Sequence, residues 1–440
     1  MQPRPAEHEA TIFAQASGAG RAALAVLRLS GPGTGMILDA LCGDRPPARR
    51  AALRRLRARE GEELDQAIVL WFPGPRSYTG EDSAELQLHG GPAVVAGVAE
   101  ALVALGARPA EAGEFTRRAV LNGRMDLLAA EGIADLVEAE TEAQRRQALR
   151  QMEGELSTLY AGWADRLRTA LAFQEALIDF PDEDLPLEVE GELTASLYTL
   201  RAEIGVHLDD NRRGERLREG LVFAVAGAPN VGKSSLVNAL AERDVAIVSP
   251  IAGTTRDALE VRVVLGGVPV TLIDTAGLRE TDDPVEAEGV RRARARAAGA
   301  DLILALTDAS GAGQGDEAGV VPAGASVLRI VTKADLCPAP IDSLAVSART
   351  GAGMAALRER LAAEATRLTQ AAGPPPLTRA RHRAALTAAA AALDAATPAP
   401  LPELRAEELR LALREIGRIT GAVDVEAILD TVFSRFCIGK

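Results

Sequence analysis

The stretch "GAPNVGKSSL", residues 227–236, decides the fold of the middle of the chain. It follows the apolar run "GLVFAVAG" and precedes residues of helical character, so it joins a buried strand to a helix. Gly227 and Gly232 let the backbone wrap closely around phosphate oxygens. Lys233 supplies charge to the β- and γ-phosphates, and the Ser234 hydroxyl can ligate Mg²⁺. The motif predicts a phosphate-binding loop and therefore a nucleotide site.

Two later segments extend this predicted phosphate site. "DTAG", residues 274–277, closes a second apolar run. The Asp274 carboxylate can reach the metal through water, and the Gly277 amide can meet the γ-phosphate, so this region senses whether that phosphate is present. Between the two motifs lies "SPIAGTTRD", in which Thr255 is expected to be the second hydroxyl ligand of Mg²⁺.

The segment "TKAD", residues 332–335, predicts a guanine site. Asp335 can accept two hydrogen bonds from the N1 and N2 donors of guanine, which adenine cannot match. GTPases normally carry asparagine at the position of Thr332, and one hydroxyl cannot replace both arms of an amide. We therefore expect guanine selectivity to be kept and affinity to be weakened. "VSART" supplies Ser347 and Ala348 as the backbone cradle on the other side of the base.

The hydrolytic machinery differs from that of Ras-like switches. Those switches place a glutamine after the "DTAG" glycine to orient the attacking water, but this chain has Leu278. An apolar side chain cannot hold water, so another group must act or hydrolysis must be slow. Asn230 lies beside the phosphates, where its amide and the carbonyls of "SPIAGTT" could ligate a monovalent cation in place of an arginine finger. The alternative is that Asn230 only forms a turn before a tight loop.

Residue patterns divide the chain into four segments. Residues 1–121 read as a mixed α/β domain, with strands expected at "TIFAQAS", "AALAVLRLS", "QAIVLWFPG" and "ELQLHGG". Residues 122–216 and 373–440 share a helical texture, which suggests one helical domain split by an insertion. Residues 217–372 form that insertion and alternate strands with helices, as in a P-loop G domain with a doubly wound, mostly parallel sheet.

Composition narrows the class of protein further. The net charge of −13 disfavours a protein that coats itself in nucleic acid. No run approaches the roughly 18 apolar residues of a membrane span, and the first residues lack the features of a signal peptide. Cys42, Cys337 and Cys437 lie far apart without metal-ligand spacing, so we expect a cytoplasmic protein in a reducing compartment.

With these motifs in place, the chain resembles the MnmE (TrmE) family of tRNA modification GTPases from end to end. The resemblance rests on "GRAALAVLRLSG", "WFPGPRSYTGED", "ELQLHGGP", "GEFTRRAVLNGRMDL", "GAPNVGKSSLVNAL", "IAGTTRD", "DTAGLRE" and the terminal "FCIGK". It implies a K⁺-stimulated GTPase whose G domains dimerise across the nucleotides. K⁺ would be bound by Asn230, Ser249, Ile251 and Thr254, and Glu286 would act on the hydrolytic water. Without the resemblance, Glu286 would be taken as a solvated helix-start residue.

The same resemblance assigns a second site and the partners. The N-terminal domain of the family binds a tetrahydrofolate derivative, 5-formyl- or 5,10-methylene-tetrahydrofolate, and holds the chain as a homodimer. Arg28, Glu85 and Arg124 match the folate-contacting positions, although the family usually has lysine at the last of these. Cys437 would lie near the one-carbon chemistry and Lys440 would contact the folate. For Cys437, the alternative is a small buried apolar residue.

The implied reaction adds an aminomethyl or carboxymethylaminomethyl group to carbon 5 of the wobble uridine of certain tRNAs. The partner would be the flavoprotein MnmG, which carries FAD, in a heterotetramer.

The residues expected to contact GTP are Asn230, Val231, Gly232, Lys233, Ser234, Ser235, Ser249, Thr254, Thr255, Asp274, Thr275, Ala276, Gly277, Thr332, Lys333, Asp335, Ser347, Ala348 and Arg349.

Two alternatives belong to other classes of protein. The first is a ribosome-assembly GTPase without group-transfer chemistry, but no KH-type RNA module follows the G domain. The second is a lipidated switch, since Cys437 is fourth from the end. The final Lys440 lies outside the usual prenyl-acceptor set and "DTVFSRF" before the cysteine is not basic, so this alternative is disfavoured.

Overall fold

The chain contains two compact units. The computed structural model describes residues 10–179, 187–241, 260–274, 297–309, 326–337, 343–370 and 375–423, together with Leu429, Phe433, Phe436 and Gly439. The first unit consists of Met1–Ala134, Gln151–Ala164 and Ile416–Lys440, and the second of Asp135–Arg150 and Asp165–Glu415. The first unit therefore joins residues from both ends of the chain.

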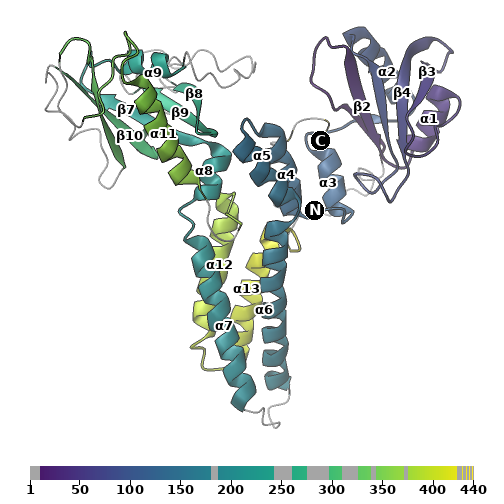
Figure 1. Ribbon diagram of the computed structural model, residues 1–440. Helices are drawn as coiled ribbons and strands as arrows, with labels where there is room; N and C mark the ends of the chain where they lie inside the picture. Colours follow the sequence, from purple (N-terminus) through teal and green to yellow (C-terminus); the bar gives the residue numbers. More distant parts are fainter. Residues whose placement is uncertain are drawn as a thin grey trace, which may run out of the picture. The chain divides into compact units, whose positions relative to one another are not determined.

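A six-stranded sheet in the order β3-β4-β5-β2-β1-β6 forms the centre of the first unit (Figure 1). Its strands are β1 (Ile12–Gln15), β2 (Leu24–Ser30), β3 (Ala52–Arg57), β4 (Glu63–Phe72), β5 (Ser83–His89) and β6 (Arg108–Pro109). Neighbours are antiparallel except β1 and β6. Along β2, the buried Ala25, Leu27 and Leu29 recur at every second residue, as in a strand with one face on a core. The four strands expected from the sequence are confirmed.

The two faces of this sheet have different partners. On one face, Leu27 and Leu29 pack in a hydrophobic core with Leu38 of α1 (Thr34–Cys42) and Leu102 of α2 (Pro92–Ala104). The other face carries Ile12 and Ala14, which cluster with Phe115 of α3 (Glu114–Leu121). Arg28 pairs across the sheet with Ala14 on β1 and Glu85 on β5, so it belongs to this second face.

The end of the chain packs in the first unit. Leu429, Phe433 and Phe436 form a buried cluster with Leu127 and Ala130 of α4 (Leu127–Glu138), and the partly buried Val120 of α3 packs against it. Gly113, which precedes α3 at φ 69°, lies so close to Phe433 that an added Cβ would be 2.9 Å from its side chain. A residue with a side chain would therefore be strained and would also clash.

A five-stranded sheet in the order β11-β10-β7-β9-β8 forms one part of the second unit. Its strands are β7 (Leu221–Gly227), β8 (Glu260–Leu265), β9 (Val268–Asp274), β10 (Leu302–Asp308) and β11 (Val327–Thr332). All pairs are parallel except the β8–β9 hairpin, so the prediction of a mostly parallel sheet is confirmed. Gly266 and Gly267 both have positive φ, as a tight two-residue hairpin turn requires. Leucines and valines of these strands pack with α9 (Lys233–Ala241) and α11 (Met354–Thr369).

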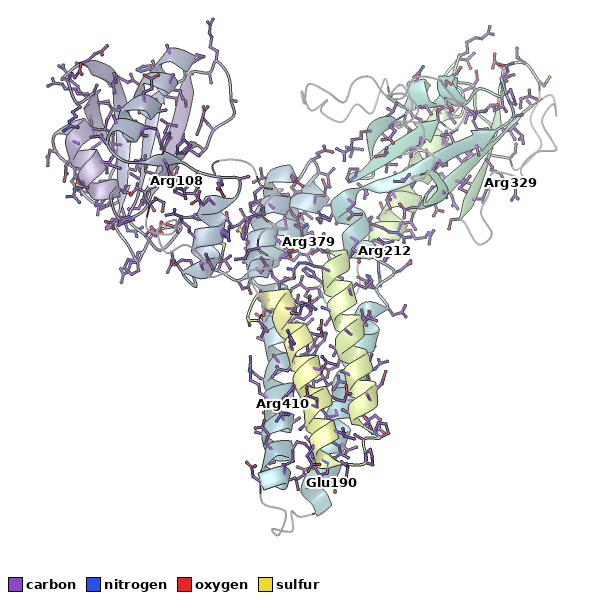
Figure 2. All side chains as sticks on the ribbon, turned by 180° about the vertical axis from the view of Figure 1, so that it is seen from behind. Arg108, Glu190, Arg212, Arg329, Arg379 and Arg410 are labelled. Atoms are coloured by element: carbon purple, nitrogen blue, oxygen red, sulfur yellow. The ribbon has the colours of Figure 1, made fainter. Side chains whose placement is uncertain are left out.

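Long helices form the remainder of the second unit: α7 (Leu187–Leu208), α12 (Ala380–Ala396) and most of α6 (Glu155–Asp179) and α13 (Pro402–Thr420), with the short α8 (Arg213–Glu219) and most of α5 (Glu142–Met152). Ion pairs link these helices to one another: Arg166 to Glu203, Arg201 to Asp394, Arg410 to Glu175 and Arg405 to Glu190. Figure 2 labels Arg410 on α13 and Glu190 on α7. Helices that precede the inserted sheet in the sequence therefore pack beside helices that follow it. Among the described residues, no helix is long and apolar enough to cross a membrane.

A polar junction lies where the long helices meet α8. Arg383 of α12 donates to Asp210 Oδ1 at 2.6 Å and to Glu215 Oε1 at 2.8 Å. His207, at 2% exposure, lies in the same region. Burial is the largest cause that lowers the pKa of His207 from 6.5 to about 4; Asp210 opposes this shift, and Arg383 and His382 add to it. The imidazole is therefore neutral at physiological pH.

Candidate functional site

The predicted phosphate loop connects β7 to α9. Its backbone has positive φ at Gly227 (151°), Asn230 (61°) and Gly232 (104°). A Cβ at Gly227 would lie 2.6 Å from the Leu306 carbonyl oxygen, so only glycine fits there. Lys233 begins α9, is 6% exposed, and donates through Nζ to the carbonyls of Gly227 and Ala228 at 2.7 and 2.8 Å. Burial lowers the pKa of Lys233, and the Asp274 carboxylate opposes this.

The start of α9 meets the end of β9. Ser234 donates its hydroxyl hydrogen to Asp274 Oδ2, so the two side chains predicted to serve the metal lie side by side. A hydroxyl and a carboxylate are hard oxygen donors, which suit Mg²⁺. Ser235 and Asn230 are exposed at the same end of the sheet, whereas Val231 is buried.

The segment at the end of β11 lies next to the phosphate loop. Thr332 is 4% exposed and donates to the Val231 carbonyl at 2.6 Å, with the Thr307 carbonyl at 3.2 Å. A single hydroxyl thus connects the predicted base-reading segment to the phosphate loop. Lys333 has φ 57° and places Nζ 3.4 Å from Asp308 Oδ2.

Asp335 is held by the loop predicted to cradle the base. Ser347 donates to Asp335 Oδ1 at 2.7 Å, and Arg349 Nη2 lies 3.1 Å from Oδ2. The Ser347 hydrogen bond is the largest cause that lowers the pKa of Asp335, so the carboxylate is ionised and remains an acceptor. Ala348 lies between these two partners in sequence. The structure therefore brings together the phosphate loop, the segment 332–335 and the segment 347–349.

The other predicted nucleotide and metal residues lie outside the described part of the chain. These are Ser249, Ile251, Thr254, Thr255, Thr275, Ala276, Gly277 and Glu286, together with Cys437 and Lys440 of the predicted folate site. Their assignments stay predictions.

A pocket of about 260 Å³ opens on the second face of the first unit's sheet. Arg28 and Glu85 line it, and Arg28 donates to Glu85 Oε1 through Nε at 3.2 Å and Nη2 at 2.9 Å. The Arg28 guanidinium lies over the rings of Tyr78 (5.4 Å) and Phe115 (5.9 Å). This pocket combines a carboxylate, guanidinium groups and aromatic faces, a set that suits a flat, polar heterocycle.

Several lining residues were not identified from the sequence. Arg49, Arg76, Tyr78 and Phe115 also contribute to the pocket wall. Arg76 and Tyr78 lie in "WFPGPRSYTGED" and Phe115 in "GEFTRRAVLNGRMDL", two segments that carried the family resemblance without roles for these residues, whereas Arg49 gave no signal. Arg124 is not among the lining residues; its side chain packs against Gly80, where an added Cβ would lie 3.3 Å from Arg124 Cγ and Cδ.

The described part of the C-terminal tail reaches this unit's first strand. Gly439 is buried at φ 103°, and an added Cβ would lie 2.4 Å from the Gln15 carbonyl oxygen and 3.1 Å from Ala16 Cα. Gln15 pairs with Leu27, the neighbour of Arg28 on β2. Gly439 is therefore seated against the strand next to the one that carries Arg28.

Comparisons with known proteins cover nearly the whole chain. The family model described as "GTP-binding protein TrmE N-terminus" matches residues 11–124, and the one described as "MnmE helical domain" matches residues 127–437. A protein of Gluconacetobacter diazotrophicus named tRNA modification GTPase MnmE is 63% identical over 435 residues, covering 98% of each chain. One of Granulibacter bethesdensis with the same name is 59% identical and covers 98% of this chain and 99% of its own.

Among solved structures, a variant of Aquifex aeolicus Era bound to GDP·AlF4⁻ covers 41% of this chain and 69% of its own. Its sequence identity is 26% and its TM-score 0.25, a likeness too slight to bear on function.

Proposed function

This chain belongs to the MnmE family of tRNA modification GTPases, and from that premise we propose that it couples GTP hydrolysis to modification of carbon 5 of the wobble uridine in tRNA. The observation that carries the GTP part of the proposal is that Lys233, Asp274 and Asp335 all lie at the carboxyl ends of parallel strands, after β7, at the end of β9 and after β11. Ligands of doubly wound sheets bind at the carboxyl ends of the strands.

For GTP, each described side chain has a role that its chemistry supports. Lys233 provides charge to the phosphates, and the loop amides before it donate to phosphate oxygens. Ser234 and Asp274 would hold Mg²⁺, directly and through water, and the ion would neutralise charge on the β- and γ-phosphates. The Asp335 carboxylate accepts from guanine and distinguishes it from adenine. The remaining contacts proposed are those of Thr255, Gly277 and the other residues named above.

We place a K⁺ ion beside the phosphates, held by Asn230 with Ser249, Ile251 and Thr254. Support comes from Asn230, which lies in the phosphate loop, has φ 61° and is exposed. A cation there supplies the charge that an arginine finger supplies elsewhere. Glu286 is the group proposed to act on the hydrolytic water.

The pocket of the first unit is proposed to bind a tetrahydrofolate derivative that donates the one-carbon unit. Glu85 can pair with the donor face of a pterin, and Arg28 with carbonyl or carboxylate groups. Arg124, Lys440 and Cys437 complete this proposal. Support comes from Gly439, because its seat on Gln15 and Ala16 brings the tail to the strand beside β2.

The proposed assembly is a homodimer that works with the flavoprotein MnmG, whose FAD performs the redox steps, and with tRNA. The alternative of a ribosome-assembly GTPase is set aside because the family models match residues 11–124 and 127–437, which include the segments before and after the inserted sheet. The alternative of a lipidated switch is set aside because relatives named tRNA modification GTPase MnmE match 98% of this chain.

The test is GTP hydrolysis by the full chain in K⁺ against Na⁺ at equal ionic strength. We expect hydrolysis to be faster in K⁺ and the difference to disappear in Asn230→Ala, while Arg145→Ala, which alters an exposed ion pair on α5, keeps it. Equal rates in the two salts would refute the cation mechanism. Glu286→Ala should bind GTP and fail to hydrolyse it.

A further inference from the structure

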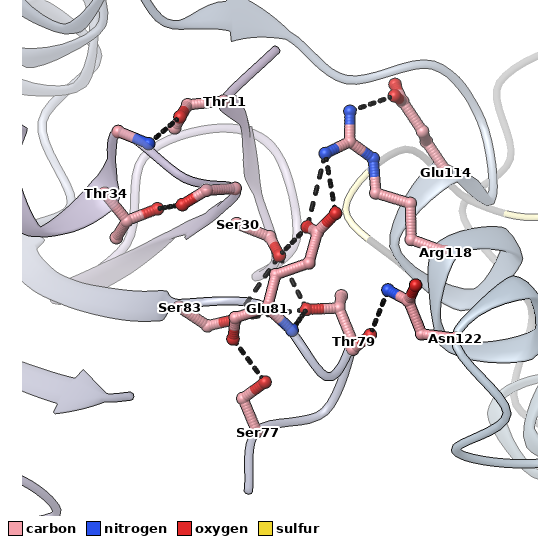
Figure 3. Close-up of polar contacts among 12 residues, drawn as sticks. Thr11, Ser30, Thr34, Ser77, Thr79, Glu81, Ser83, Glu114, Arg118 and Asn122 are labelled. Carbon is pink, nitrogen blue, oxygen red and sulfur yellow. Dashed lines mark hydrogen bonds and ion pairs between the residues drawn. The ribbon is translucent and has the colours of Figure 1, made fainter. Parts of the chain in front are cut away.

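An ion network centred on the buried Arg118 connects α3 to the segment before β5; Figure 3 shows the contacts of Arg118 with Glu81 and Glu114. Arg118 of α3 is 3% exposed. Its Nη2 donates to Glu114 Oε1 at 2.9 Å, and its Nη1 lies 3.2 to 3.3 Å from the two carboxylate oxygens of Glu81. Glu114 in turn accepts from Arg108 at 2.9 and 2.6 Å. Two guanidinium groups and two carboxylates thus alternate in a row, with Glu81 at one end.

Glu81 belongs to the segment between β4 and β5, which we call the pocket loop (residues 73–82). Its Oε2 accepts from Ser30 of β2 at 2.7 Å, so the carboxylate is held from the sheet and from α3 at once. Its backbone amide donates to Thr79 Oγ1 at 3.2 Å, and its carbonyl accepts from Ser77. The position of Glu81 therefore sets the path of the residues before it.

The same helix and the residue that follows it hold the pocket loop at two further points. Asn122 Nδ2 donates to the Thr79 carbonyl at 2.7 Å, and Thr116 Oγ1 lies 2.7 Å from the Tyr78 hydroxyl. These loop residues face the ligand space as well, because Ser77, Tyr78 and Thr79 line the pocket.

We propose that Arg118 and Glu81 are positioning residues for the pocket. Their ion pair fixes the pocket loop in the shape that sets the Tyr78 ring beneath Arg28. Neither residue lines the pocket. The identity of the ligand, a reduced folate, rests on the proposed function; the positioning itself rests on the contacts around Glu81.

The physical reason is that a loop closed only by its own short bonds opens easily. A charge-assisted pair that is shielded from water is stronger than a neutral hydrogen bond and is screened little by salt. Arg118→Met removes the cation and leaves Glu81 facing Glu114 with nothing positive between them. Arg108→Met is the matched control, because it takes an arginine from the same network and leaves the Arg118–Glu81 pair in place.

The first measurement needs no ligand. In hydrogen–deuterium exchange of the full chain, amides of the pocket loop should exchange about tenfold faster in Arg118→Met than in the wild type, while those of β4 stay protected. Arg108→Met should leave the loop unchanged. If Arg118→Met does not fold, Glu81→Gln, which keeps the Arg118–Glu114 pair, should give the same selective increase. Unchanged loop exchange, or an equal increase in the Arg108 variant, would overturn the proposal.

The second measurement is binding of 5-formyltetrahydrofolate to the full chain by calorimetry. We expect the dissociation constant to be about tenfold higher in Arg118→Met and to recover partly in Arg118→Lys. Equal binding by wild type and Arg118→Met would overturn the positioning role. Failure of the wild type to bind would instead overturn the folate assignment, and the exchange experiment would still decide the role of Arg118.

Discussion

Replacement of Thr332 tests two expectations separately: that its hydroxyl holds the phosphate loop, and that it makes a weaker contact with guanine than asparagine would. In this chain the Thr332 hydroxyl donates to the Val231 carbonyl at 2.6 Å and is 4% exposed. Thr332→Val keeps the shape of the side chain and removes the donor, so the carbonyl of the phosphate loop loses this partner. Thr332→Ser keeps the hydroxyl and is the matched control.

The size of the effect follows from this single hydrogen bond. Removal of the donor leaves a buried acceptor without this partner, which costs about 1 to 3 kcal/mol. Without this hydrogen bond, the phosphate loop samples more conformations in the nucleotide-free protein, and nucleotide binding must restrict them again. Since about 1.4 kcal/mol is a factor of ten, we expect nucleotide affinity to fall roughly five- to a hundredfold.

The assay is the dissociation constant of fluorescent GTP and of fluorescent inosine triphosphate, which lacks the guanine amino group. Because the tether acts on the phosphate loop, Thr332→Val should weaken both nucleotides by the same factor. Thr332→Asn should tighten binding of GTP, because an amide offers a donor and an acceptor where threonine has one hydroxyl. Unchanged binding by the valine variant would refute the tether, and unchanged GTP binding by the asparagine variant would refute the missing base contact.

Three further outcomes are expected. Asp335→Asn should lose GTP affinity about tenfold or more and gain affinity for xanthosine triphosphate, measured by competition, because the amide reverses one donor–acceptor pair. His207 has a folded pKa of about 4, below its ordinary 6.5, so the unfolded chain takes up the proton first and stability falls as the pH drops from 6.5 towards 4. That loss is about 2 kcal/mol by about pH 5, and urea unfolding of His207→Gln should show a smaller dependence on pH. Deletion of residues 437–440 should abolish tRNA modification and leave GTP hydrolysis intact, as read by nucleoside analysis and phosphate release.

The phosphate loop could be predicted from the sequence because its determinants are contiguous. A strand, two glycines, a lysine and a helix follow one another within residues 220–241, and local geometry alone brings them together. The strands β7, β9, β10 and β11 are near-continuous apolar runs, which are typical of a buried parallel sheet. β8 was not predicted, because its Glu260 and Arg262 interrupt the apolar pattern and only the hairpin with β9 defines it.

The pocket of the first unit could be predicted only in part. Arg28 and Glu85 were identified by resemblance, but their contact depends on the β2–β5 register, which a single sequence does not specify. Arg118 gave no signal, because its partner Glu81 is 37 residues away and meets it only when α3 packs on the sheet. The tether from Thr332 to Val231 was missed for the same reason, since it spans 101 residues.

The seat of the C-terminal tail also affects how the protein is made. Residues 1–134 leave the ribosome first, but the unit they belong to also contains residues 416–440. Phe433, Phe436 and Gly439 can pack only after they have themselves left the exit tunnel. The apolar surface of α4 that receives Phe433 therefore stays uncovered by Phe433 while some three hundred residues are synthesised, about 15 to 60 s at ordinary rates of synthesis. Chains that terminate early would carry that surface exposed, which gives a cell a physical mark by which truncated copies can be recognised and removed.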